Sequence, residues 1–193
     1  MDLVKAFITV GFAGLILWSL IERFFSLSGQ QQVGGEKKES FSYWLLSAAW
    51  YAAVGFALLD AWALQLSTFR TPLIELRTFG VMLVIIGLST RFAARRVLGK
   101  QYSIYVETSL EHRLVTGGIY SSVRHPAYLG LICLMIGIPV CEGSWGGLAI
   151  AAILGIPAVI HRINIEEKAL SQWFGTDYEK YAKKTRRLIP KIW

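Results

Sequence analysis

The residues of this chain that could do chemistry gather in one short polar stretch, LVTGGIYSSVRHPAYLG, which runs from Leu114 to Gly130 and precedes the last long apolar region. Gly117 and Gly118 allow backbone conformations that other residues resist. Pro126 suits the first turn of a helix, where its missing N–H is not needed. The stretch therefore predicts a tight loop that ends at a helix N-terminus, whose free N–H groups can bind a polar or anionic ligand. We expect the chemistry here, beside Arg124 and His125.

A second stretch of specific residues begins at His161 and reads HRINIEEKALSQWFGTDYEKYAKKTRRLIP. Its apolar residues fall at helical spacing, which predicts an amphipathic helix that Gly175 ends. Asp177 is expected to cap a shorter helix that carries Tyr178 and Tyr181. Such tyrosines are more often packing residues than ligand contacts, but the absence of another lid near the loop strengthens the case for ligand contacts.

Two adjacent carboxylates, Glu166 and Glu167, begin the amphipathic helix. Glu166 lies four residues after Arg162, so the two side chains face each other and an ion pair is expected. Glu167 projects about 100° away and cannot share that partner well. We therefore favour Glu167 as the functional carboxylate, with a cationic amine as one group that it could bind.

Several kinds of site are disfavoured by spacing. His125 has no Cys, carboxylate or second His at the spacing of metal ligands, so we expect no metal site. Its imidazole could be structural, contact a cofactor or transfer a proton, and we favour the first two roles. The chain has no GxSxG nucleophile motif and no GxGxxG motif after a strand, which argues against a serine hydrolase and a Rossmann enzyme.

The composition is typical of an integral membrane protein. The 193 residues are 54% hydrophobic with a mean hydropathy of +0.46, and the charges cluster between apolar blocks. Apolar spans are expected at Leu3–Phe25, Phe41–Leu66 and Pro72–Leu98. The fourth apolar region, Tyr128–Ile160, would be about 50 Å long as one helix, which exceeds the roughly 30 Å hydrocarbon core, so it should form a hairpin. Residues that mark its turn are Pro139, Glu142, Gly143, Ser144, Gly146 and Gly147. The predicted fold is all-α, with five membrane helices and cytoplasmic C-terminal helices.

The basic residues predict the orientation. With the N-terminus outside, 17 of the 20 Lys and Arg residues face the cytoplasm, together with the loop and the C-terminus. The net charge of +7 suits anionic membrane lipids, and nucleic acid is disfavoured because the basic residues flank apolar spans. We expect one domain over residues 1–193, with three spans in 1–100 and the loop, hairpin and C-terminal helices in 101–193. A monomer in the inner cell membrane, or in an endoplasmic-reticulum-like membrane, is expected.

The two motifs together resemble the isoprenylcysteine carboxyl methyltransferase family, most closely its small prokaryotic members with five membrane helices. The resemblance rests on GGIYSSVRHPAYLG followed by EEKALSQWFGTDYEKYAKKTRRLIP. It implies S-adenosylmethionine as the methyl donor, bound in a cytoplasmic pocket. The cofactor-binding residues that it implies are His112, Leu114, Val115, Gly118, Tyr120, His125, Tyr128, Leu129, Glu167 and Tyr181. The catalytic residues that it implies are Glu167 and a basic residue after the second tyrosine, for which Lys184 stands nearest and Arg186 and Arg187 follow. Arg124, a loop cation that could hold a carboxylate, is our further catalytic candidate.

The residues permit this reaction but leave alternatives open. A carboxylate with a pKa near ~3.5 is ionised at pH 7 and needs no general base, only an Arg or Lys to hold it. Methyl transfer to the carboxylate of a lipid-modified acceptor is therefore our first expectation, with the lipid tail reaching the site from the bilayer. An amine acceptor would need a base, which Glu167 or His125 could supply, so a phospholipid or amine N-methyltransferase is the second. A nicotinamide-dependent membrane reductase is the third, and a membrane scaffold without catalysis is the alternative from another class.

Overall fold

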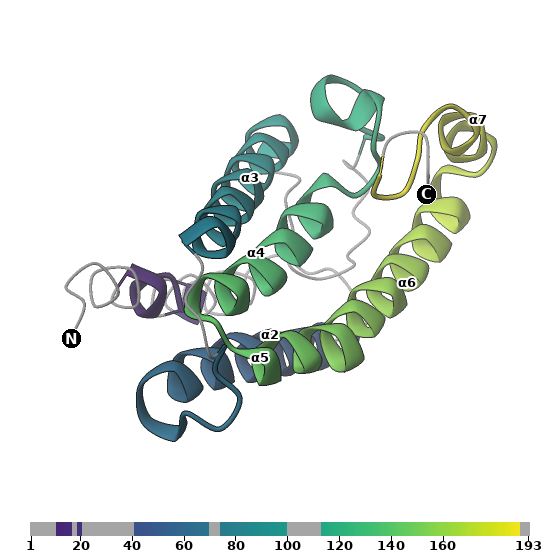
Figure 1. Cartoon of the computed structure of the whole chain (residues 1–193). Coiled ribbons are helices and arrows are strands. Elements are labelled where there is room, and N and C mark those ends of the chain that lie inside the picture. Colours follow the sequence, from purple (N-terminus) through teal and green to yellow (C-terminus); the bar gives the residue numbers. More distant parts are fainter. Residues whose placement is uncertain (1–10, 17–18, 21–40, 70–73, 100–112, 190–193) are drawn as a thin grey trace.

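The computed structural model describes residues 11–16, 19–20, 41–69, 74–99 and 113–189, and this part of the chain is helical without a β-strand (Figure 1). The α-helices are α2 (Phe41–Leu59), α3 (Ile74–Leu98), α4 (Pro126–Glu142), α5 (Trp145–Ile150), α6 (Ile156–Phe174) and α7 (Thr176–Lys184). Two π-helical turns, Asp60–Leu64 and Ala151–Gly155, and a 3-10 turn, Gly118–Ser121, complete them. The all-helical prediction is confirmed. Most of the expected span Leu3–Phe25 lies outside the described residues.

Three of the described helices are long and apolar enough to cross a membrane: Phe41–Leu64, Ile74–Leu98 and Trp145–Phe174. The fourth, α4, is apolar but has only 17 residues. The helix Trp145–Phe174 has 30 residues and is therefore about 45 Å long, more than the hydrocarbon core needs. Its C-terminal part extends past the apolar region, as the sequence predicts. The chain is an integral membrane protein.

The predicted hairpin turn lies at Gly143 and Ser144. Gly143 ends α4 with φ +76°, a conformation that favours glycine, and Ser144 begins the return helix by accepting a hydrogen bond from the Gly147 N–H at 3.1 Å. Of the other residues expected to mark this turn, Pro139 and Glu142 lie inside α4 and Gly146 and Gly147 lie inside α5, so that part of the prediction is wrong. The turn follows from the backbone freedom of Gly143 and the capping hydroxyl of Ser144 instead.

Glycines bring α3 and α4 into backbone contact. A Cβ atom placed on Gly87 would lie 2.7 Å from the Gly130 carbonyl oxygen, and one on Gly80 would lie 2.6 Å from the Cys141 nitrogen. Small residues at such an interface allow helices to approach closely inside a membrane. The N-terminal end of α4, where the polar loop arrives, is therefore held against α3.

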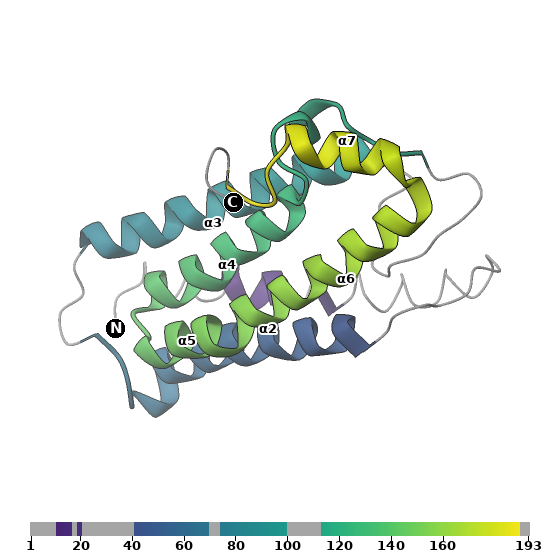
Figure 2. The ribbon, with the colours of Figure 1, turned by 90° about the vertical axis from the view of Figure 1, so that its right-hand side faces the viewer.

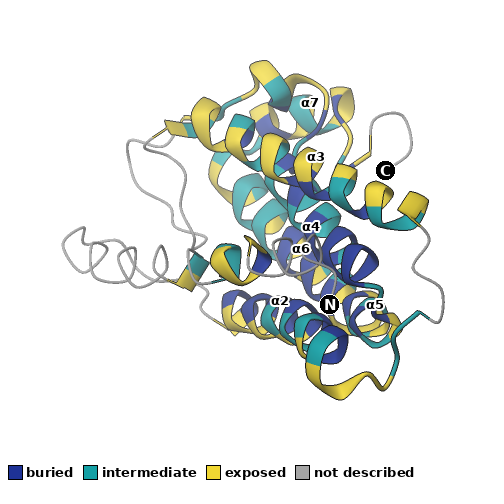
Figure 3. Ribbon diagram, turned by 60° about the vertical axis from the view of Figure 1, so that its left-hand side comes forward, coloured by how far each residue is buried: buried dark blue, intermediate teal, exposed yellow. Residues whose placement is uncertain are grey.

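The outer face of α3 is apolar and exposed (Figure 3). Its exposed large side chains include Phe79, Met82, Ile85, Ile86 and Phe92. A water-soluble protein would bury most of such a surface. The face is suited to contact with lipid tails.

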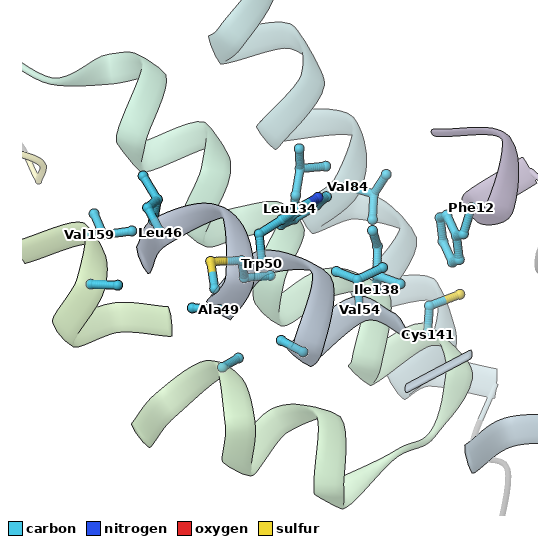
Figure 4. Packing of buried hydrophobic residues seen from close by; sticks show 14 of the residues in the cluster. Phe12, Leu46, Ala49, Trp50, Val54, Val84, Leu134, Ile138, Cys141 and Val159 are labelled. Carbon is cyan, nitrogen blue, oxygen red and sulfur yellow. The ribbon is translucent and has the colours of Figure 1, made fainter. Parts of the chain in front are cut away.

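The apolar core lies between α2, α4 and the long helix Trp145–Phe174 that follows the hairpin turn. Figure 4 shows Leu134 and Ile138 of α4 beside Trp50 and Val54 of α2, with Val159 of α6 at the edge of the same cluster. All five side chains are buried. This core positions α4 and α6 relative to each other, and both helices continue from it toward the polar loop (Figure 2).

A buried carboxylate closes the opposite end of the helices. The Asp60 side chain accepts hydrogen bonds from the Leu66 N–H at 2.8 Å, from the Ser67 hydroxyl at 2.6 Å and from the Ser144 hydroxyl at 2.7 Å. These bonds join the loop after α2 to the hairpin turn. The two ends of the molecule therefore differ: one is locked by Asp60, and the other carries the polar loop and α7.

We predict that Gly87→Ala destabilises the protein by about 1–3 kcal/mol, because the added methyl group must push α3 away from the α4 backbone. Thermal unfolding in detergent, followed by tryptophan fluorescence, measures this loss. Gly55→Ala is the matched control, since a Cβ atom at Gly55 meets no atom within 4 Å. Equal melting midpoints for the two variants would contradict the close contact between the helices.

Candidate functional site

The C-terminal segment 185–189, called here the C-terminal strap, lies along the polar loop (Figures 1 and 2). The Arg124 and His125 N–H groups donate to the Arg186 and Arg187 carbonyl oxygens at 2.7 and 3.0 Å, and the Arg186 N–H donates to Ser122 at 3.1 Å. Strap and loop thus share a short β-like ladder just before α4 begins at Pro126. The predicted helix start at this proline is confirmed.

The Arg124 side chain joins three elements. Its Nε donates to Glu167 Oε1 on α6 at 2.9 Å, and its Nη1 donates to the carbonyl oxygens of Ala182 and Thr185 at 2.9 and 2.6 Å. The last carbonyl groups of a helix have no partner within the helix, so the guanidinium caps the C-terminus of α7. Arg124 therefore holds α6, α7 and the strap to the loop.

The Glu167 carboxylate lies at the centre of a cluster with Arg124, His125 and Arg187, called here the Glu167 cluster. Its Oε1 atom accepts from Arg124 and lies 3.3 Å from His125 Nε2, while its Oε2 atom lies 2.6 Å from Arg187 Nη2. The side chain is only 13% exposed. Two guanidinium groups, one from the loop and one from the strap, thus share one nearly buried carboxylate, and such charge-assisted hydrogen bonds are the stronger kind.

Glu166 has different partners. The Tyr128 hydroxyl donates to Glu166 Oε2 at 2.7 Å, and Arg162 Nε donates to the same hydroxyl at 3.2 Å. The direct ion pair expected between Arg162 and Glu166 is not found among the described contacts, and the Tyr128 hydroxyl connects the two side chains instead. Arg162 is 3% exposed and also donates to the Ser42 hydroxyl of α2 at 2.7 Å. Because a guanidinium only donates hydrogen bonds, it leaves the Tyr128 proton directed at Glu166.

His125 lies between the two carboxylates. Its Nδ1 atom is 3.9 Å from Glu166, and its Nε2 atom is the one that approaches Glu167. The imidazole is almost completely buried and packs against the Tyr128 ring at a centroid distance of 5.8 Å. These positions suit a structural or ligand-binding imidazole more than a solvent-exposed proton carrier.

Tyr181 connects α7 to the loop. Its hydroxyl donates to the Tyr120 carbonyl oxygen at 2.7 Å, and burial raises the pKa of Tyr181 to about 12, so the phenol stays protonated. The prediction that Asp177 caps α7 is wrong. Gly175 takes the cap position with φ +51°, and Asp177 lies in the first turn, where it makes an exposed ion pair with Lys180 at 3.8 Å.

The structure thus brings together six of the residues predicted for the site. They are Tyr120, Arg124, His125, Tyr128, Glu167 and Tyr181. Leu114 and Val115 are half-buried upstream in the same segment, and Leu129 packs against the apolar core. Gly118 has φ +60° beside Val97 of α3. Lys184 is exposed at the end of α7, and His112 lies outside the described residues.

The partners within the site were not predicted from the sequence, as Ser42 and Arg187 illustrate. Ser42, which binds Arg162, is separated from it by the whole length of the chain between α2 and α6, and no local pattern marks it. Arg187 was one of three candidate basic residues after the tyrosines, and only its pairing with Glu167 distinguishes it. Tertiary contacts of this kind leave no periodic signal in a single sequence.

We predict that Arg124→Gln exposes the end of α7 to protease, because the substitution removes the charge-assisted bonds that cap its carbonyl groups. A loss of about 2–4 kcal/mol in local stability is expected. Limited trypsin digestion with mass spectrometry should show faster cleavage after Lys183 and Lys184 than in the wild type. Asp177→Asn is the control, since its exposed ion pair contributes little. Unchanged cleavage in Arg124→Gln would refute the capping role.

Comparisons with known proteins identify the family of the chain. A family model described as phospholipid methyltransferase matches residues 76–177, more than half of the chain. The chain is similar to the protein-S-isoprenylcysteine O-methyltransferase of Saccharomyces cerevisiae, with 36% identity over 58% of this chain and 48% of that protein. It is also similar to protein-S-isoprenylcysteine O-methyltransferase A of Arabidopsis thaliana, with 31% identity over 59% of each.

A solved structure gives the same result at the level of the fold. It is that of the eukaryotic intramembrane Ras methyltransferase ICMT (isoprenylcysteine carboxyl methyltransferase), with a TM-score of 0.57 and 25% identity over 80% of this chain and 54% of that one. The chain spans about half to three fifths of the length of these proteins. The resemblance to the isoprenylcysteine methyltransferases is confirmed, and the chain belongs to the phospholipid methyltransferase family.

Proposed function

We propose that the protein transfers a methyl group from S-adenosylmethionine to the carboxylate of a lipid-modified, isoprenylcysteine-like acceptor at the cytoplasmic face of the membrane. The observation that carries the proposal is the Glu167 cluster, in which the loop, α6 and the C-terminal strap meet at one end of the membrane helices. The names of the relatives supply the reaction and the acceptor class.

The groups of the cluster fit such a methyl donor, which carries a sulfonium, an ammonium and a carboxylate. Glu166 is a carboxylate with 31% of its side chain exposed, and Tyr120 and Tyr128 are aromatic neighbours. Carboxylates and aromatic faces suit cationic groups. The residues that we propose to hold the donor are Leu114, Val115, Gly118, Tyr120, His125, Tyr128, Leu129, Glu167 and Tyr181, and His112 stays a prediction outside the described part.

Bound S-adenosylmethionine supplies an electrophilic methyl group on sulfur. The protein's residues then have to hold the acceptor carboxylate in line with that methyl group and exclude water, since a displacement that neutralises opposite charges is faster in a less polar site. We assign the carboxylate-holding role to Arg187 in place of Lys184. Arg187 binds Glu167 while staying about one third exposed, whereas Lys184 is exposed and has no ion pair with Glu167 among the described contacts.

A second candidate function is N-methylation of a phospholipid amine, which the description of the matching family model favours. That reaction needs a base to remove a proton from the amine. Glu167 is poorly suited to this task because it already accepts from two guanidinium groups. Glu166, about one third exposed, is the other carboxylate, but it already accepts a hydrogen bond from the Tyr128 hydroxyl. Because both carboxylates have partners within the protein, the contacts favour the carboxylate acceptor over the amine.

The membrane arrangement that we propose has five spans in one domain, with the N-terminus outside and the C-terminus in the cytoplasm. It is supported by the three described spanning helices, by the additional apolar helix α4 and by the distribution of basic residues. The lipid tail of the acceptor would reach the cluster from the bilayer, while its carboxylate stays at the polar end of the helices.

The proposed acceptor predicts a methyl transfer rate that is flat between pH 6 and pH 8, because the carboxylate loses its proton far below this range. The purified protein, in detergent or vesicles, is given S-adenosylmethionine with a radiolabelled methyl group. Prenylcysteine and phosphatidylethanolamine serve as parallel acceptors. Label in prenylcysteine with a flat profile supports the proposal, whereas label confined to the phospholipid with a rate that rises with pH assigns the N-methyltransferase function.

We further predict that Arg187→Ala lowers prenylcysteine methylation at least about 10-fold, the usual scale for losing a charged contact to a substrate. Glu167→Ala should abolish turnover, since it releases both guanidinium groups. Lys184→Ala is the matched control, a cation three residues away that is exposed, and it should keep wild-type rates. If Lys184→Ala loses activity and Arg187→Ala retains it, the basic residue has been assigned wrongly.

A further inference from the structure

One buried polar group in the cluster lacks a hydrogen bond. The Tyr178 side chain on α7 is 5% exposed, and its hydroxyl oxygen is buried without a hydrogen-bond partner in the described part of the chain. Buried hydroxyl groups in native proteins nearly always have a partner, because leaving one unpaired costs free energy. An unpaired hydroxyl in a cluster of functional groups therefore points to a partner that arrives from outside the chain.

The surroundings of this hydroxyl are charged. Burial raises the pKa of Tyr178 well above its ordinary value, and the nearby Glu167 and Glu166 carboxylates raise it further, while Arg124 acts in the opposite direction. The phenol is therefore protonated at neutral pH. Glu167 acts on the hydroxyl both as a charge and as a nearby acceptor that raises the Tyr178 pKa, although the contact falls short of a well-formed hydrogen bond and leaves the oxygen lone pairs of the phenol without a donor.

Tyr181, three residues along the same helix, provides the contrast. The two rings pack edge to face with centroids 6.2 Å apart. The Tyr181 hydroxyl has a partner within the protein, the Tyr120 carbonyl oxygen at 2.7 Å. One tyrosine of the pair thus fastens α7 to the loop, and the other keeps its hydrogen-bonding capacity free within the cluster.

We propose that the Tyr178 hydroxyl binds the ammonium group of the methyl donor and of its demethylated product, an inference that rests on the proposed function. A phenol can accept one hydrogen bond and donate another. The ammonium N–H would donate to the Tyr178 oxygen, and the phenolic O–H would turn to donate to the Glu167 carboxylate. Glu167 is already neutralised by Arg124 and Arg187, but Glu166 accepts from the Tyr128 hydroxyl and also acts on Tyr178, so it supplies the negative charge that favours a cation here. The bound ligand then completes the hydrogen bonds of the buried hydroxyl.

The test compares Tyr178→Phe with Tyr181→Phe in the full-length protein in detergent. Calorimetry measures the affinity for S-adenosylhomocysteine and for methylthioadenosine, which lacks the amino-acid portion. Tyr178→Phe should weaken S-adenosylhomocysteine binding by ~10- to 100-fold, the scale of a hydrogen bond to a charged group, and leave methylthioadenosine binding unchanged. Its melting midpoint without ligand should equal or exceed that of the wild type. Tyr181→Phe should lower that midpoint, because it removes a bond within the protein.

The outcomes distinguish a failure of the Tyr178 inference from a failure of the proposed function. If the wild type binds S-adenosylhomocysteine and Tyr178→Phe binds it equally well, the inference about Tyr178 is wrong and the proposed function stands. A Tyr178→Phe variant that melts earlier and loses both ligands equally would show a structural role and would also overturn the inference. If the wild type binds neither ligand, the proposed function fails and this inference fails with it.

Discussion

The Glu167 carboxylate binds the Arg124 and Arg187 guanidinium groups at 2.9 and 2.6 Å, and these contacts hold the three segments of the site together. Arg124 comes from the loop before α4, Arg187 from the strap after α7, and Glu167 from α6. Without the shared carboxylate, two cations would be left close together in a poorly hydrated place, which is unfavourable. One acidic side chain thus holds the strap to α6 and also binds a loop residue that is 43 positions away in the sequence.

The membrane helices make this arrangement possible because they fix the positions of the N-terminus of α4 and of the C-terminal half of α6. Backbone contact between α3 and α4 at Gly87 and Gly130 fixes the position of the loop relative to α3. The buried Arg162 joins α6 to α2 through Ser42. At the far end, Asp60 locks the hairpin turn. The long return helix then carries Glu166 and Glu167 beyond the apolar core to meet the loop. Polar contacts at both ends of the helices, and apolar packing between these ends, thus position the residues of the site.

Much of this architecture can be predicted from the sequence because its signals are local. Apolar blocks indicate the spans, Gly143 and Ser144 lie in the predicted turn, and Gly175 ends the amphipathic helix as expected. Predictions from local sequence were wrong at several positions. Helix α4 continues through Pro139, and Gly175 rather than Asp177 occupies the N-cap of α7. The partners of Arg162 and Glu167 could not be predicted, since they come from distant segments whose side-chain directions are set only by the packed fold.

The central claim is that the loop, α6 and the C-terminal strap form one site for the methyl donor. Hydrogen–deuterium exchange of the purified protein, with and without S-adenosylhomocysteine, tests it most directly, because exchange reports ordering of each backbone segment separately. We expect ligand binding to slow backbone amide exchange in residues 118–129, 163–170 and 178–188 together, with little change at the Asp60 end of the molecule. Protection limited to the Asp60 end, or no protection in the strap while the ligand is bound, would contradict it.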